Sequence, residues 1–273
     1  MFNARAARPL SFSTLGCPSL DWDSTLDLAQ ASGMAGIELR CLRGETLEPT
    51  NVADLLPRPP NARHDLTQRQ LKVPMLGTSV KLLEATTADI TALQTLGATA
   101  DALDCPWLRV FDGGDASTPP SASHWAQVAA WMADWETQRN RAGIRTQLAV
   151  ETHDALVHPL ALQALRQQLP DLAVLWDLHH TWRAGVALPD TAALLGDAVC
   201  HVHLKDSINK PSPRKPFTYC LPGDGKFPWA EALTVLNQLG YRGALSLEWE
   251  QHWHPYLPPL AEALPRFRAL CET

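Results

Sequence analysis

Four polar residues stand at the ends of four successive short apolar runs in the second half of the chain. They are Glu151 after LAV, Asp177 after AVLW, His203 after VCHV and Glu248 after ALSL. Runs of this length and composition are typical of strands that are buried on both faces of a parallel sheet. Because parallel strands joined by helices place their carboxyl ends on one side of the sheet, we expect three carboxylates and an imidazole to meet there. That set of donors would bind a divalent metal ion.

The spacing of the four residues fits one strand and one helix between neighbours. Asp177 follows Glu151 by 26 residues, and His203 follows Asp177 by another 26. Glu248 follows His203 by 45 residues, and the additional length is the segment 207–226, which is too rich in Pro, Gly and Ser for a helix. Long insertions after a barrel strand commonly cover a substrate. We therefore predict that residues 207–226 form a lid over the active site and are more mobile than the barrel without ligand.

Eight segments with strand character alternate with helix-like segments along the chain. They are residues 10–16, 36–41, 73–80, 106–113, 146–153, 172–179, 198–206 and 243–250. Such alternation indicates parallel strands with right-handed crossovers, and eight units favour a closed barrel over an open sheet. The chain has 273 residues, close to the roughly 250 of one such barrel. The predicted fold class is α/β, a single (β/α)8 TIM barrel with one domain over residues 1–273.

Capping residues and prolines predict where several helices begin or break. Asp23 or Ser24 is expected to cap the first helix, and Pro228 suits the first turn of a later one. Three prolines between residues 57 and 60 interrupt the helix of the second unit, which makes that unit the weakest of the eight.

Composition excludes several classes of partner. The net charge is −6 and the basic residues form no extended block, so nucleic acid is not an expected partner. The six cysteines contain no C-x-x-C pair and are expected to be free thiols in a reducing cytoplasm. No signal-like or membrane-length apolar run is present, so we expect a cytoplasmic protein without a membrane partner. A small-molecule substrate is expected, and a homo-oligomeric assembly is left open.

Several segments around the predicted strand ends form a recognisable set. They are GMAGIELR (33–40), ETHD (151–154), WDLHH (176–180), HVHLKD (201–206), LPGDGKFPW (221–229) and GYRGALSLEWE (240–250). Together they resemble the xylose isomerase-like TIM-barrel superfamily, also described as the sugar phosphate isomerase/epimerase family, over nearly the whole chain. This superfamily contains sugar isomerases, epimerases and related dehydratases.

The resemblance implies roles for individual residues. The metal ligands of the superfamily match Glu151, Asp177, His203 and Glu248. His180, three residues after the aspartate, resembles a substrate-contacting histidine, and His153 stands where some members carry a polar contact or a proton-transfer group. Asn209 stands where the ketose 3-epimerases place a substrate-binding arginine, so the resemblance leaves the substrate class open.

The number of metal ions follows from a further comparison within the superfamily. Its DNA-repair endonucleases carry additional histidines on strands 2 to 4, and the segments GIELRC, LGTSVK and VFDGG contain none. We therefore expect one divalent ion, which the donor set allows to be Mn²⁺, Mg²⁺, Co²⁺ or Zn²⁺.

The expected chemistry is proton transfer next to a carbonyl group. A metal that chelates a carbonyl and its neighbouring hydroxyl would stabilise an enediolate. Glu151 and Glu248 would act as base and acid, aided by His153 or His180. Substrate contacts are expected from residues at the strand ends, namely Arg40, Lys81, His180, Lys205 and Trp249.

The function predicted first is a metal-dependent isomerase or epimerase of a small sugar or related hydroxy-carbonyl compound, in carbohydrate metabolism and with manganese as a suitable metal. A dehydratase for a 3-dehydroshikimate-type or inosose-type substrate is the alternative, supported by the pair Glu151 and His153. A non-catalytic sugar- or metal-binding barrel is the third interpretation, and it would be expected to lack a ligand.

Three local questions stay open at the level of the sequence. Glu250 competes with Glu248 for the ligand role, because both lie on one strand face. Lys205 and Asp206 form either a pair that orients the following loop or a pair on the surface. His201 is expected to point away from His203 and to pack behind the barrel wall.

Overall fold

An eight-stranded parallel sheet forms the centre of the computed structural model, which describes residues 8–272. Its strands in chain order are β1 (Leu10–Ser13), β2 (Gly36–Glu38), β5 (Leu76–Lys81), β6 (Trp107–Phe111), β7 (Gln147–Glu151), β8 (Ala173–Asp177), β9 (Val199–Leu204) and β12 (Leu245–Leu247). Each lies within one of the eight predicted segments, apart from one residue at the end of β5. The order across the sheet is β2-β1-β12-β9-β8-β7-β6-β5.

Backbone hydrogen bonds between the two outermost strands close the sheet into a barrel. Ile37 N donates to Lys72 O at 3.0 Å, and Leu39 N donates to Met75 O at 3.0 Å. Gly77 N returns a bond of 2.8 Å to Leu39 O. The predicted (β/α)8 barrel is therefore confirmed.

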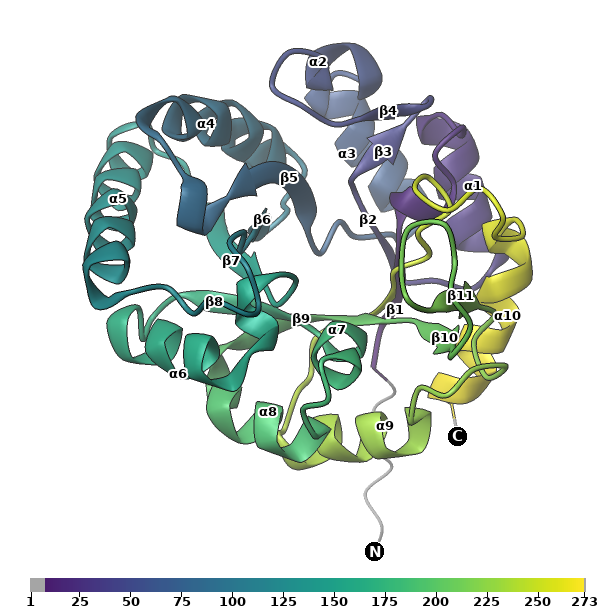
Figure 1. The fold of residues 1–273 in the computed structure, drawn as a ribbon. Helices are drawn as coiled ribbons and strands as arrows, with labels where there is room; N and C mark the ends of the chain where they lie inside the picture. The colour runs from purple at the N-terminus through teal and green to yellow at the C-terminus, as the bar shows by residue number, and fades with distance from the viewer. Residues whose placement is uncertain (1–7, 273) are drawn as a thin grey trace, which may run out of the picture.

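Helices surround the strands in a ring (Figure 1). They are α1 (Trp22–Ala31), α2 (Val52–Leu55), α3 (Pro59–Gln68), α4 (Thr87–Ala102), α5 (Ala122–Arg141), α6 (Pro159–Gln168), α7 (Leu178–Arg183), α8 (Leu188–Leu195), α9 (Trp229–Gln238) and α10 (Leu260–Cys271). Short 3-10 turns occupy Thr14–Gly16, Leu82–Glu84, Ala155–Val157 and Gly196–Ala198. Among the described residues, no helix has the length and apolar content needed to cross a membrane.

Three expectations about helix ends are wrong in detail. Asp21, rather than Asp23 or Ser24, caps α1, and its Oδ1 accepts a hydrogen bond of 3.0 Å from Ser24 N. Pro59 and Pro60 begin α3 instead of interrupting it. N–H groups in the first turn of a helix have no partner within the helix, so a residue without an N–H group is tolerated there. Pro228 is the residue before α9 and not part of its first turn.

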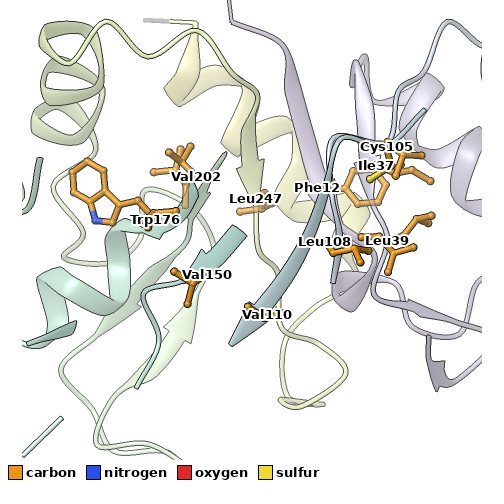
Figure 2. Packing of buried hydrophobic residues seen from close by; sticks show 14 of the residues in the cluster. Phe12, Ile37, Leu39, Cys105, Leu108, Val110, Val150, Trp176, Val202 and Leu247 are labelled. Carbon is orange, nitrogen blue, oxygen red and sulfur yellow. The ribbon is translucent and has the colours of Figure 1, made fainter. Parts of the chain in front are cut away.

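The outward side chains of the strands pack against the helices and make the main hydrophobic core. Figure 2 shows Phe12, Leu108, Val150, Val202 and Leu247, which come from five strands and are fully buried. Because side chains alternate along a strand, the neighbours of these residues point into the barrel. A second, smaller cluster of Met75, Ala149 and Leu175 fills part of that interior. Many of the other inward positions are polar, among them Arg109, Glu151 and His203, and they carry the candidate site.

The segment predicted to be a lid contains a small antiparallel hairpin of β10 (Asp206–Ile208) and β11 (Thr218–Cys220). A separate hairpin elsewhere in the chain, β3 (Cys41–Leu42) with β4 (Glu45–Thr46), follows strand β2.

Asp206 ties the predicted lid segment to the barrel. The buried carboxylate of Asp206 accepts hydrogen bonds from Gly223 N at 2.9 Å, Phe227 N at 3.0 Å and the indole of Trp229 at 3.0 Å. Asp206 therefore ties the end of the segment to the barrel, and the greater mobility of residues 207–226 stays a prediction.

Substituting Gly225 with alanine is expected to destabilise this tether. A Cβ atom at this position would lie 2.0 Å from Asp206 Oδ1 and 2.6 Å from Ser207 O. Overpacking of this kind costs about 1–3 kcal/mol, and the loss of bonds to Asp206 adds to it. Urea unfolding measures the effect, and limited proteolysis within residues 207–226 should accelerate.

Gly240→Ala is the matched control. Gly240 has a positive φ of 75°, but a Cβ atom at this position would meet no other atom within 4 Å, so that variant reports backbone strain alone. Equal losses of stability in both variants, with unchanged proteolysis, would contradict a role for Gly225 in the tether.

Candidate active site and metal centre

Four side chains from four strands converge at the carboxyl end of the barrel. Glu151 is the last residue of β7, Asp177 is the last of β8, His203 lies in β9, and Glu248 directly follows β12. One ligand atom from each of these residues lies within 4.8 Å of the others. All four side chains are buried, with 5% exposure for Glu248 and none for the other three. The structure thus brings together the four residues singled out from the sequence.

The donor atoms of this group fit a metal ion. His203 Nδ1 lies 3.3 Å from Glu151 Oε1 and 3.4 Å from Glu248 Oε2. Within residues 8–272, neither His203 Nδ1 nor either carboxylate oxygen of Glu151 makes a hydrogen bond. Buried polar atoms without such partners are rare and call for an explanation. A cation held between hard oxygen donors and one imidazole nitrogen would satisfy them.

The end of strand β8 explains how Asp177 reaches this position. Asp177 is also the N-cap of α7, and its Oδ1 accepts a hydrogen bond of 2.8 Å from His180 N. Helix α7 therefore begins at once, which leaves Oδ2 directed toward the other three side chains of the group. The same turn places His180 Nδ1 3.3 Å from Asp177 Oδ2.

A buried ammonium group lies among the carboxylates. Lys205 Nζ is 2.8 Å from Asp177 Oδ2, donates to Glu248 Oε2, and donates to Glu250 Oε1 at 2.8 Å. Burial opposes the charged form, but the carboxylates of Asp177 and Glu248 raise the pKa of Lys205 well above its usual range. Glu250 thus binds Lys205 and is outside the four-residue group. Neither expectation of a pair between Lys205 and Asp206 is met, because each side chain has other partners.

The charges of the four candidate ligands and their neighbours influence one another strongly. Burial would lower the pKa of His203, but Glu248 and Glu38 hold it well above its usual range. Burial raises the pKa of Asp177 to about 6, although Lys205 opposes the rise. Burial likewise opposes ionisation of Glu248, yet His203 and Lys205 keep its pKa well below the usual range. The site therefore holds several buried charges that stabilise one another.

Two histidines, His153 and His180, lie next to the group of four candidate ligands. The rings of His153 and His180 meet edge to face with centroids 4.7 Å apart. His153 Nδ1 is 2.9 Å from Asp154 Oδ1. Burial opposes it, but this hydrogen bond and the charge of Glu151 raise the pKa of His153 to about 9. Burial lowers the pKa of His180 well below its usual range, and the charge of Lys205 adds to this.

Asp112, just after the end of β6, fixes the loop that carries His153. Its carboxylate accepts hydrogen bonds from the backbone N–H groups of Asp154 at 2.9 Å and Leu156 at 2.7 Å. Burial raises the pKa of Asp112 to about 7, which these hydrogen bonds oppose.

Of the five expected substrate contacts, only Lys205 and His180 touch the central group. Arg40 is buried and donates to Ser79 Oγ at 2.8 Å, with Glu48 Oε1 3.4 Å away. Lys81 is half exposed and pairs with Glu84 at 3.4 Å. Trp249 packs in the hydrophobic core, where its Nε1 donates to Pro258 O at 2.9 Å. Trp249 therefore faces away from Glu248, as strand alternation requires.

Two charged residues of the barrel interior were missed from the sequence. Arg109 in β6 is 1% exposed, lies 3.3 Å from Glu151 Oε2 through its Nε, and donates to Thr78 O at 3.0 Å. Glu38, the last residue of β2, accepts hydrogen bonds from His201 and His203. Arg109 and Glu38 both occupy inward positions of short strands. Glu38 is the last residue of its strand, as Glu151 and Asp177 are of theirs, and this position in the sequence could have identified it as a site residue.

His201 also points into the barrel, so the expectation that it packs behind the wall is wrong. Residues two apart on a strand share a face, and His201 and His203 have ring centroids 5.8 Å apart.

The family model for the xylose isomerase-like TIM barrel matches residues 26–270. The chain therefore belongs to this family, as the resemblance of its motifs implied. Among proteins with curated descriptions, none matches the sequence.

Several solved structures share the fold over almost the full length of both chains. The probable 3-DHS dehydratase AsbF of Bacillus anthracis, involved in petrobactin synthesis, has a TM-score of 0.76 at 16% identity and covers 96% of this chain and 98% of its own. The IolI protein with a bound zinc atom has a TM-score of 0.75 at 15% identity, with 96% of each chain covered. D-psicose 3-epimerase, solved in the presence of D-fructose, has a TM-score of 0.70 at 14% identity, with 97% of each covered. At these identities the similarity establishes the fold alone.

Proposed function

We propose that this protein is a metal-dependent isomerase or epimerase of a small sugar or related hydroxy-carbonyl compound. The observation that carries the proposal is the convergence of Glu151, Asp177, His203 and Glu248, whose buried ligand atoms lie within 4.8 Å of one another. One divalent ion, Mn²⁺, Mg²⁺, Co²⁺ or Zn²⁺, would be held by these four side chains. The zinc atom bound to the structurally similar IolI protein supports a divalent metal in this fold.

A bound divalent ion would supply Lewis acidity, which makes a hydrogen next to a carbonyl group more acidic. The chain's own residues would move the proton. Glu151 and Glu248 belong to β7 and the end of β12, which are separated in the sheet by β8 and β9, so they approach the centre from different sides. In the proposal one carboxylate removes the proton and the other returns it on the opposite face, which inverts or relocates the stereocentre.

The neighbouring residues would hold the substrate. His180 lies beside the candidate ligands and can bind its hydroxyl or carbonyl oxygens, while Lys205 places a positive charge next to the bound substrate. Arg109 holds Glu151 in place through the contact of 3.3 Å between Nε and Oε2. Because all of these groups are almost fully buried, water would be excluded around a bound substrate. We further propose a cytoplasmic location, in keeping with the six free cysteines.

A dehydratase is the second candidate, and the pair of His153 and Asp154 favours it. Elimination requires a proton donor for the departing hydroxyl group, and an imidazole hydrogen-bonded to a carboxylate at 2.9 Å is suited to that role. The buried cation Lys205 would favour an acidic substrate of the 3-dehydroshikimate type. The fold shared with AsbF agrees with this alternative. A non-catalytic barrel is least supported, because all four ligands are present.

Reaction in deuterated water distinguishes these candidates. The protein loaded with Mn²⁺ should turn over one of a panel of ketoses, inososes and dehydroshikimate, and it should place solvent deuterium on the carbon next to the carbonyl. An unsaturated carbonyl product, detected by its absorbance, would identify the dehydratase. The chelator-treated protein is the control and should be inactive. Turnover without deuterium in the product or in recovered substrate would contradict proton transfer and favour internal hydride transfer.

A further inference from the structure

Glu38 forms a hydrogen-bonded centre inside the barrel, next to the four proposed metal ligands but not among them. Its side chain is fully buried and reaches two other strands. On β9, His203 Nε2 lies 2.9 Å from Oε2, and His201 Nε2 lies 3.0 Å from the same oxygen. On β12, the hydroxyl group of Ser246 lies 3.1 Å from Oε2. Three polar groups that are distant in sequence from Glu38 thus share its carboxylate.

The two nitrogens of the His203 ring have different surroundings. Among the described residues, its Nε2 hydrogen-bonds to Glu38, whereas its Nδ1 is surrounded by oxygens of Glu151, Glu248 and Asp177 at 3.3, 3.4 and 3.9 Å. An ionised carboxylate accepts hydrogen bonds and cannot donate them, so Nε2 must carry a proton. A metal bound at Nδ1 would displace any proton held there and leave the proton on Nε2, so that Nδ1 offers its lone pair. This is the atom that faces the other ligands.

We propose that Glu38 is a positioning residue that fixes the tautomer and orientation of His203, so that Nδ1 is presented to the metal. Histidine ligands in metal sites generally donate their second ring N–H to a carboxylate or carbonyl, and loss of that partner weakens metal binding by about 10–100-fold. The proposal rests on the proposed metal centre. Glu38 would be a fifth residue of that centre. It would act through His203 and would not contact the metal itself.

His201 and Ser246 hold the carboxylate in turn. Both donate to Oε2 of Glu38 from positions adjacent to His203 in the folded barrel. Because Glu38 is fully buried, bulk solvent does not compete with these donors for its oxygens. The orientation of His203 is therefore determined by packing and hydrogen bonds before any metal arrives, which lowers the ordering cost of binding.

The test is Mn²⁺ affinity, measured by calorimetric titration of the chelator-treated full chain. Glu38→Gln should bind Mn²⁺ about 10–100-fold more weakly than the unmodified protein. The substitution removes the negative charge that attracts the imidazole proton, and it replaces one of the two accepting oxygens near Nε2 with an NH₂ donor. Ser246→Ala is the matched control: it removes a donor to the same oxygen without touching His203, and its affinity should change less than about threefold. Wild-type affinity in a folded Glu38→Gln variant would overturn the proposal.

A second measurement stays informative if Glu38→Gln does not fold. In zinc-loaded protein with ¹⁵N-labelled histidine, the His203 ring should show a proton on Nε2 and none on Nδ1. A proton on Nδ1 with the metal on Nε2 would refute the role of Glu38. The proposed metal centre fails in a different way: the unmodified protein would then bind neither Mn²⁺ nor Zn²⁺ at these residues.

Discussion

Replacing Glu151 with glutamine is expected to reduce solvent exchange of the substrate's α-hydrogen by about 10³-fold, within the range that a positioned general base contributes. Glutamine keeps the size of the side chain and one oxygen donor but cannot accept the proton. The Oε2 atom of Glu151 is also 3.3 Å from Arg109, so its position is set by a group that the substitution leaves intact. Deuterium exchange of the substrate, followed by NMR at saturating Mn²⁺, measures the effect.

Glu248→Gln is the comparison that assigns the two carboxylates. Metal content has to be determined for both variants, because both residues are proposed ligands. If Glu151 is the base, Glu248→Gln should retain exchange while product formation falls, since the proton would leave but would not be returned on the other face. Exchange that persists at the original rate in Glu151→Gln would move the role of base to Glu248 or to a histidine.

Lys205→Met is expected to destabilise the metal-free protein by about 3–5 kcal/mol, the usual cost of removing one partner from a buried ion pair. The ammonium group is 1% exposed and contacts Asp177, Glu248 and Glu250. Without it, these carboxylates would remain buried with less compensating positive charge. A divalent ion would supply that charge, so Mn²⁺ should stabilise the variant more than it stabilises the unmodified protein. Urea unfolding with chelator and with Mn²⁺ measures both differences.

Lys81→Met provides a control at an exposed ion pair. Lys81 is half exposed and pairs with Glu84 at 3.4 Å, so its loss should cost less than about 1 kcal/mol. It should also leave the effect of Mn²⁺ unchanged. If Lys205→Met were as stable as Lys81→Met in chelator, the carboxylates would not depend on the ammonium group, and the charge argument would fail.

The strands and the convergence of four polar residues were predictable because both follow from local patterns. Short apolar runs that alternate with helical segments specify parallel strands, and their carboxyl ends share one side by topology. Glu151, Asp177 and Glu248 could therefore be grouped without knowledge of any contact. Helix ends were less predictable, because Asp21 and Ser24 offer caps of similar chemistry within one turn, and only the backbone conformation selects between them.

Tertiary structure alone decided the partners of the charged residues inside the barrel. Glu38 and His203 are 165 positions apart and meet because β2 and β9 lie on the same barrel, while Lys205 and Glu248 are 43 apart. Strand alternation indicates that a side chain points inward, but not which of several inward groups it contacts. In the buried interior of a barrel each charge needs a partner, and closure of the sheet determines which partners are within reach. The sequence by itself therefore determined the fold and the convergence of Glu151, Asp177, His203 and Glu248, and the closed barrel decided which further residues join them and how their charges are balanced.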